Sequence, residues 1–187
     1  MTLRKNIILL GMKHCGKSTL GALLAERFGC ALFDIDDLVE VAYQHRTGSY
    51  ASARDIFRNH GEEFFARLEW EVVIELGKLL DSQDGCAVIS LGGRTILNER
   101  ARHILEHMGP RVYLQVDPEE LYRRVLGTGL PAFLDASDPK GSFMRIFQER
   151  RSQYERLANV TVNLDNLGPE AALEALLSAL KEHVDER

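Results

Sequence analysis

Short apolar segments alternate along this chain with longer segments in which apolar residues recur every three or four positions. The short segments are typical of buried strands, and the longer ones of helices with one apolar face. We predict strands over 6–10, 31–33, 86–91, 111–116 and 159–164, and helices over 18–28, 62–80 and 169–184. Alternation of the two kinds of element favours an α/β fold, with a parallel sheet covered by helices on both faces.

The first predicted strand leads directly into the residues GMKHCGKS, numbered 11–18. They match the phosphate-binding pattern G-x-x-x-x-G-K-[ST], and the predicted helix follows at once. Gly11 and Gly16 let the backbone turn so that its N–H groups approach phosphate oxygens. Lys17 would reach the β- and γ-phosphates, and the Ser18 hydroxyl would ligate Mg²⁺. The loop therefore predicts a nucleoside triphosphate site, and the alternative is a glycine turn without a ligand.

Composition narrows the class of protein. With 187 residues, 45% hydrophobic and 27% charged, the chain is predicted to form one domain over 1–187. A net charge of -5 argues against a general nucleic-acid binder. Cys15, Cys30 and Cys86 form no C-x-x-C pair, so a reducing, cytoplasmic location is expected. The apolar run that ends at Leu10 is too short for an export signal, and no run reaches the length of a membrane span.

Three carboxylates follow the second predicted strand, at Asp34, Asp36 and Asp37. Ligands of parallel sheets bind at the carboxyl ends of the strands, so these side chains suit Mg²⁺ coordination or orientation of an acceptor hydroxyl. If the strand pattern continues, Asp34 and Asp36 share a side. We expect Asp37 to cap a helix that begins near Leu38.

Glycines and arginines supply further candidates. Gly92 and Gly93 follow the third strand and allow close approach of a ligand to the backbone. One arginine of the pair Arg150-Arg151 is expected to face the cleft and bind an anion, while the other is exposed to solvent. The same two alternatives apply to the pair Arg123-Arg124. The segment 127–141 is flanked by glycines and broken by prolines, and we predict a lid there, with a surface excursion as the alternative.

In this order the motifs resemble those of the shikimate kinases, over nearly the whole chain. The matching pieces are the loop 11–19, Asp34-Ile35-Asp36 with Glu40, Ile56-Phe57, Gly61-Glu62, Phe65, Glu69, Gly92-Gly93, Val112-Tyr113-Leu114, Arg150, Tyr154 and Pro169. The resemblance implies a three-layer P-loop fold with a five-stranded parallel sheet, helices on both faces and a lid. It implies ATP as donor, Mg²⁺ as cofactor, a small-molecule substrate and a place in aromatic amino acid biosynthesis. We expect a monomer that binds neither nucleic acid nor membrane.

The same resemblance implies the roles of individual residues. Lys17 and Asp36 are the implied catalytic residues, and Ser18 with Asp34, the latter through water, would hold the metal. ATP would be bound by Gly11, Lys13, His14, Cys15, Gly16, Lys17, Ser18, Thr19 and, beside the adenine, Arg124 and Pro169. The acceptor would be bound by Asp36, Gly92, Gly93, Arg94 and Arg150.

Departures from the family pattern fall mostly on the acceptor side. Ala66 stands where the family has an arginine for the shikimate carboxylate, and Arg67 is turned about 100° away along the helix. Arg94 replaces a third glycine, and Leu130 replaces the lid arginine, for which Lys140, Arg123 or Arg94 are candidate substitutes. A milder departure is His14, in place of a common loop glycine.

These departures leave two accounts of the acceptor. Either Arg94 restores the cation lost at Ala66 and the acceptor is an acid such as shikimate, or the acceptor is another polyol or sugar acid such as gluconate. A third possibility is a nucleotide-binding regulatory protein that has lost catalysis. An Arg94 side chain directed at the cleft beside Asp36 and Arg150 would favour an anionic acceptor. The main interpretation is ATP-dependent phosphoryl transfer to a hydroxyl of a small metabolite, with shikimate as the best named acceptor.

Overall fold

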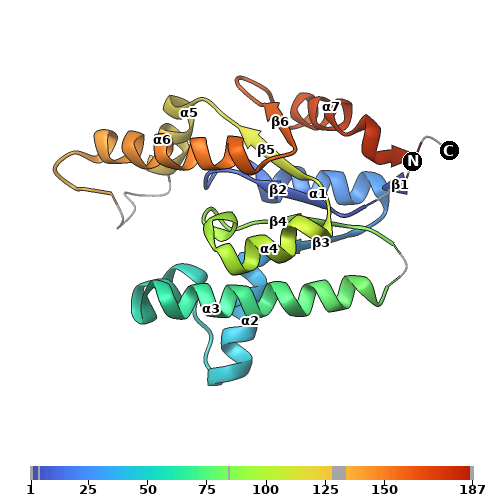
Figure 1. The fold of residues 1–187 in the computed structure, drawn as a ribbon. Helices are drawn as coiled ribbons and strands as arrows, with labels where there is room; N and C mark the ends of the chain where they lie inside the picture. The colour runs from blue at the N-terminus through green and yellow to red at the C-terminus, as the bar shows by residue number, and fades with distance from the viewer. Residues whose placement is uncertain (1, 4, 84, 128–133, 186–187) are drawn as a thin grey trace.

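A five-stranded parallel sheet forms the centre of the molecule (Figure 1), in the order β3-β4-β2-β5-β6. The computed structural model describes residues 2–3, 5–83, 85–127 and 134–185. The strands are β2 (Ile7–Leu10), β3 (Ala31–Asp34), β4 (Ala87–Ser90), β5 (Arg111–Gln115) and β6 (Val160–Asn163). The predicted α/β class and its five-stranded sheet are confirmed. β2 and β4 are buried at every position, as expected for strands covered on both faces.

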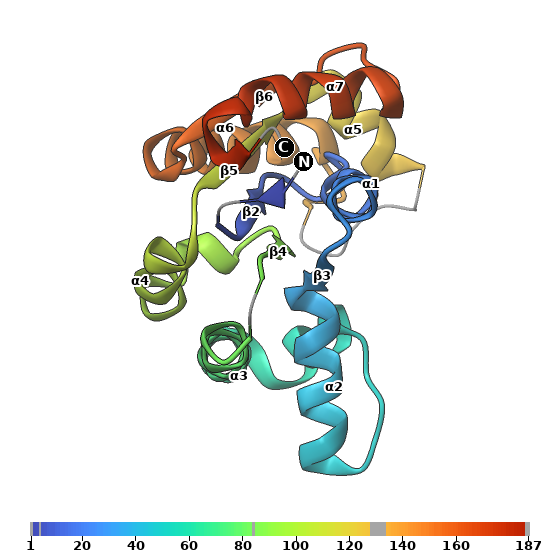
Figure 2. The same ribbon diagram turned by 90° about the vertical axis from the view of Figure 1, so that its right-hand side faces the viewer.

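Helices cover both faces of this sheet. They are α1 (Lys17–Phe28), α2 (Ile35–Thr47), α3 (Ala53–Asp81), α4 (Glu99–Met108), α5 (Pro118–Leu126), α6 (Pro139–Leu157) and α7 (Pro169–Ala179). α1 packs on β4 and on α7, whereas α3 packs on α4, and Figure 2 shows α1 and α4 on opposite sides of the strands. α2 and α3 lie against each other and extend beyond the edge strand β3. None of the described helices is both long and apolar enough to cross a membrane.

The two helices that follow β3 begin at polar caps. The Asp34 side chain accepts a hydrogen bond from the Asp36 N–H, so α2 begins at Ile35, directly after the strand. The prediction that Asp37 caps this helix is therefore wrong, and Asp37 lies exposed in its first turn. Ser52 caps α3, which is interrupted by non-helical dihedral angles at Gly61 (φ 80°, ψ 177°). Gly61 thus separates a short first segment from the predicted helix over 62–80.

Two predicted boundaries are corrected by the structure. The helix predicted over 169–184 ends at Ala179, and a 3₁₀ turn (Lys181–His183) leads into β7 (Val184–Asp185). β7 pairs with β1 (Thr2–Leu3), which brings the two ends of the chain together. The predicted lid over 127–141 is shortened at its end, because α6 already begins at Pro139. Leu130 and its neighbours in 128–133 lie outside the described residues.

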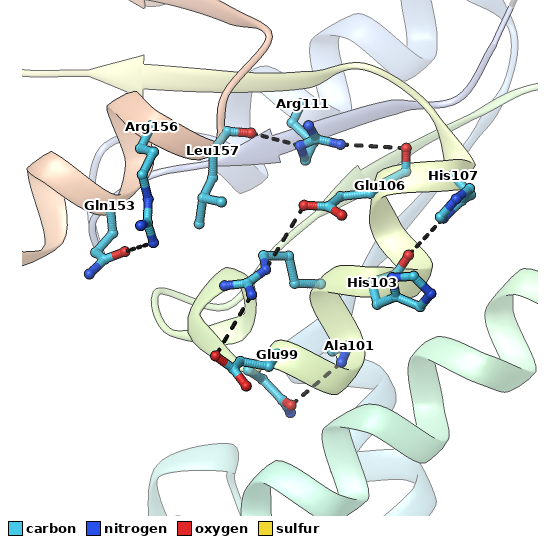
Figure 3. Close-up of polar contacts among 11 residues, drawn as sticks. Glu99, Ala101, His103, Glu106, His107, Arg111, Gln153, Arg156 and Leu157 are labelled. Atoms are coloured by element: carbon cyan, nitrogen blue, oxygen red, sulfur yellow. Dashed lines mark hydrogen bonds and ion pairs between the residues drawn. The ribbon is translucent and has the colours of Figure 1, made fainter.

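Arg111 joins the start of β5 to two helix ends (Figure 3). Its Nε donates to the Leu157 carbonyl at 2.7 Å, and its Nη1 donates to the Glu106 carbonyl at 3.5 Å. Glu106 and Leu157 lie in the last turns of α4 and α6, where carbonyl groups lack helical partners and carry partial negative charge. A single guanidinium therefore stabilises both helix ends, at the amino-terminal end of β5, whereas the phosphate loop follows the carboxyl end of β2.

Candidate active site

The phosphate loop connects β2 to α1 in the predicted strand–loop–helix arrangement. Gly11 has φ 148° and Gly16 has φ 102°, both in the region that disfavours other residues. A Cβ on Gly11 would also lie 2.9 Å from the Leu114 carbonyl oxygen. Among the described residues, no side chain caps the N-terminus of α1 at Gly16, so its first N–H groups and its positive dipole end are available to an anion.

Lys17 is 8% exposed and folds back over the loop. Its Nζ donates to the carbonyls of Gly11 at 3.0 Å and Met12 at 2.9 Å, and it lies 3.8 Å from the Cys15 sulfur. These contacts hold a buried cation beneath the turn, and a bound phosphate offers it a stronger, charged acceptor. Cys15 itself is buried, so its contribution to a ligand site is made mainly through the backbone.

Asp34 collects three hydrogen bonds at the carboxyl end of β3. The hydroxyls of Ser18 and Ser90 donate to its Oδ2 at 3.0 and 2.9 Å, and the Asp36 N–H donates to its Oδ1 at 3.0 Å. One carboxylate and a hydroxyl are hard oxygen donors that suit Mg²⁺, which usually takes its remaining ligands from water and phosphates. The described residues hold no cluster of three or more acidic, histidine or cysteine side chains that would bind a metal without such help.

Asp36 lies in the first turn of α2 and lines the same cavity as the loop lysine, Lys17. Burial raises the pKa of its carboxyl group, and the neighbouring Asp34 raises it further, while Lys17 opposes the shift. Its Oδ1 lies so near Gly92 that a Cβ there would approach it to 2.4 Å. Gly92 is therefore needed for space, so that Asp36 can pack beside the end of β4.

A cavity of about 510 Å³ brings most of the predicted residues together. It is lined by Lys13, His14, Gly16, Lys17, Ser18, Thr19, Asp34, Asp36, Ser90, Leu91, Gly93 and Arg124. A smaller cavity of about 230 Å³ adjoins it and is lined by Cys15, Gly16, Thr19, Leu20, Arg124, Leu164, Leu167, Pro169 and Ala172. The first cavity is polar and suits phosphates, whereas apolar side chains in the second suit a planar base.

Arg124 connects the two cavities from α5. Its Nη1 donates to the His14 carbonyl at 3.0 Å, and its Nη2 forms an ion pair with Glu120. Pro169, the first residue of α7, also lines the smaller cavity. Both residues that the resemblance assigns to the adenine thus line one cavity.

The two candidate arginines of the acceptor side come from different elements. Arg150 of α6 lies beside Gly93, where its Nη1 would be 3.8 Å from an added Cβ. Burial and the proximity of Arg94 lower the pKa of its guanidinium. Arg94 forms an ion pair with Glu62, and its guanidinium lies over the Phe57 ring, 5.5 Å from the centroid. Arg94 is therefore near Arg150 but held toward α3 by Glu62, and it is not among the residues that line the cavity with Asp36.

Of the three candidates to replace the lid arginine, Lys140 and Arg94 form ion pairs and Arg123 is exposed. Lys140 forms an ion pair with Glu119 at 2.8 Å, and both side chains are more than half exposed. Arg123 is exposed on α5, one residue before Arg124. Arg94 is paired with Glu62.

Glu69 is the centre of a buried polar cluster that the sequence did not predict. In the sequence, Glu69 stood out only as one residue of the family pattern. Glu69 is 3% exposed and accepts hydrogen bonds from the Thr95 hydroxyl at 2.7 Å and the Asn98 amide at 3.0 Å. Burial raises the pKa of this carboxyl group. Asn98 also donates to the Ala66 carbonyl at 2.8 Å, so the cluster ties the end of β4 to α3. The sequence signal for this cluster is that Glu69, an acidic residue, falls on the apolar face of the helix predicted over 62–80.

Comparison with known proteins decides the family. A family model described as shikimate kinase matches residues 13–181. A curated shikimate kinase from Thermobifida fusca is 39% identical over 182 residues, covering 96% of this chain and 97% of that protein. The chain belongs to the shikimate kinase family. It is thus an ATP-dependent small-molecule kinase, a phosphotransferase.

Solved structures agree with this assignment. A shikimate kinase from Acinetobacter baumannii in complex with shikimate superposes with a TM-score of 0.78 at 27% identity, covering 97% of this chain and 96% of the other. A gluconokinase from Sinorhizobium meliloti superposes with a TM-score of 0.57 at 16% identity, covering 97% and 94%. The second likeness extends to the fold alone, so family membership favours the shikimate kinase interpretation over the gluconate alternative.

Proposed function

We propose that this protein transfers the γ-phosphoryl group of ATP to a hydroxyl of shikimate. The observation that supports it most is that Asp36 lines the same cavity as Lys17 and Ser18 of the phosphate loop and as Asp34. The residues that would bind ATP therefore share one cavity with the residue that would receive the acceptor hydroxyl. In addition, the structure of a shikimate kinase from Acinetobacter baumannii was solved in complex with shikimate.

On the donor side, the residues bind and neutralise the triphosphate. Backbone N–H groups of the loop and of the α1 N-terminus receive the phosphates, and the base lies between Arg124 and Pro169. Lys17 exchanges its carbonyl partners for phosphate oxygens. Ser18 would hold Mg²⁺ directly and Asp34 through water, and the ion would supply charge neutralisation at the β- and γ-phosphates.

On the acceptor side, Asp36 accepts a hydrogen bond from the attacking hydroxyl and takes its proton as the phosphoryl group is transferred. The carboxylate of the acceptor is received by Arg150, together with Arg94 once it leaves Glu62. Gly92 and Gly93 leave room for the ring beside the end of β4. In this arrangement Arg94 provides the cation that Ala66 lacks.

Measurement of ADP release with shikimate, with gluconate and without an acceptor tests this proposal. We expect release that depends on shikimate and Mg²⁺, and that is lost in Asp36→Asn while Mg-ATP binding is retained. Release stimulated only by gluconate would contradict the proposed acceptor. Normal ATP binding without stimulation by either compound would favour a regulatory nucleotide-binding protein.

A further inference from the structure

Within the phosphate loop, His14 has a backbone conformation that is unfavourable for a residue with a side chain. Its φ is 65°, in the left-handed region where glycine is favoured and where histidine is tolerated better than most residues. A glycine would remove this strain without changing the course of the loop. Strained residues of this kind are concentrated at functional sites, where the surrounding structure holds them.

The His14 side chain lies among the groups that would receive the triphosphate. It is half-buried and lines the polar cavity of about 510 Å³. Its carbonyl is held by Arg124, so the residue is fixed between the loop and α5.

The imidazole faces charged groups from every element around it. Lys13 and Lys17 belong to its own loop, Arg124 with its partner Glu120 comes from α5, and Asp34 and Asp36 line the same cavity. Burial lowers the pKa of His14, and Lys13, Lys17 and Arg124 lower it further. The imidazole is therefore neutral in the ligand-free protein near neutral pH.

We propose that His14 contacts the phosphates of ATP as an imidazolium, so that nucleotide binding takes up a proton at this side chain. The inference rests on the proposed function and adds a binding residue to its donor site. The triphosphate brings several negative charges to a position where three cations now face the ring, and it reverses the local field.

The sign of the pH dependence follows from this change. The pKa of His14 is low in the free protein and higher in the complex, so the complex binds more protons between the two values. Affinity for Mg-ATP therefore rises as the pH falls through the pKa of the complex, and it levels off below the pKa of the free protein.

Titration calorimetry with Mg-ATP, in two buffers of very different ionisation enthalpy, measures the protons taken up. His14→Asn is the test variant, because asparagine also tolerates positive φ but does not titrate in this range. His14→Gly is a second variant, which relieves the strain and is expected to melt no earlier than the wild type. His103→Asn, on the remote helix α4, is the matched control (Figure 3).

We expect the wild type and His103→Asn to take up more protons than either His14 variant at about pH 7. The affinity of His14→Asn for Mg-ATP should be about three- to tenfold weaker near pH 6 and closer to the wild type near pH 8. Equal proton uptake by wild type and His14→Asn would overturn the inference, and so would a loss of affinity independent of pH. Absence of any binding heat in the wild type would instead contradict the proposed function.

Discussion

Replacing Glu62 by glutamine frees the Arg94 guanidinium with little change in the size of its partner. Both side chains of this ion pair are partly exposed, Arg94 by 45% and Glu62 by 68%. An ion pair this exposed contributes about 0–1 kcal/mol, because water and salt screen it. If Arg94 must leave Glu62 to receive the acceptor carboxylate, removing the pair lowers the KM for shikimate by about two- to fivefold.

The opposite change is expected when the cation itself is removed. Arg94→Ala deletes a charged hydrogen-bond donor, which is typically worth about 1.5–3 kcal/mol. Because the side chain is half exposed, we expect the lower end of this range, a rise in the KM for shikimate of about tenfold. Ala66→Arg in this background places a cation at the family's usual position and should restore part of the affinity.

Steady-state kinetics with shikimate and ATP varied separately measure both effects. Glu63→Gln removes the same charge from the adjacent exposed position and serves as the matched control. The KM for ATP should stay unchanged in all of these variants. The reasoning is refuted if Glu62→Gln raises the KM for shikimate, or if Arg94→Ala leaves it unchanged.

Three further predictions follow from individual contacts. In Gly92→Ala, the new Cβ would lie 2.4 Å from Asp36 Oδ1, so displacement of the carboxylate by about 1 Å should lower kcat about 100-fold. Gly77→Ala on α3, where the Cβ meets nothing nearer than Ile104 at 3.8 Å, should retain full activity. Asp36→Asn should lower kcat by at least about 100-fold yet raise the Tm, because the folded-state pKa of Asp36 is raised and its charged form therefore destabilises the fold at neutral pH. Because this raised pKa belongs to the free enzyme, the wild-type kcat/KM for shikimate should fall as the pH drops through it, and a limb in the usual carboxyl range would argue against Asp36 as the base. Arg111→Ala removes the contacts with two helix ends and should cost about 1–2 kcal/mol, a fall in Tm of about 3–6 °C, without a change in kcat/KM. A changed KM for either substrate would show that the amino-terminal end of the strands is coupled to the candidate active site.

Much of the fold and of the donor side could be predicted from the sequence, because the signals there are local. The spacing of Gly11, Gly16, Lys17 and Ser18 specifies a loop between a strand and a helix, and the alternating apolar segments specify the sheet. Asp34 and Asp36 do lie in one cavity, but not for the reason of strand alternation. The chain turns into a helix at Ile35, and Asp34 as its cap holds Asp36 in place.

The acceptor side could not be predicted, because its geometry depends on partners distant in the sequence. The direction of Arg94 is set by Glu62 and Phe57, which α3 brings within reach only after the chain has folded. Ser90 became recognisable as a partner of Asp34 only once the register paired β3 with β4. Local propensity contains no information on either contact.

Phosphorus NMR of the protein mixed with ATP, Mg²⁺ and shikimate tests the central claim most directly. The account predicts that the γ-phosphate resonance of ATP is lost as ADP and one phosphate monoester of shikimate appear in equal amounts, and that Asp36→Asn forms neither. Formation of ADP with free inorganic phosphate, or no loss of ATP although the nucleotide binds, would contradict it.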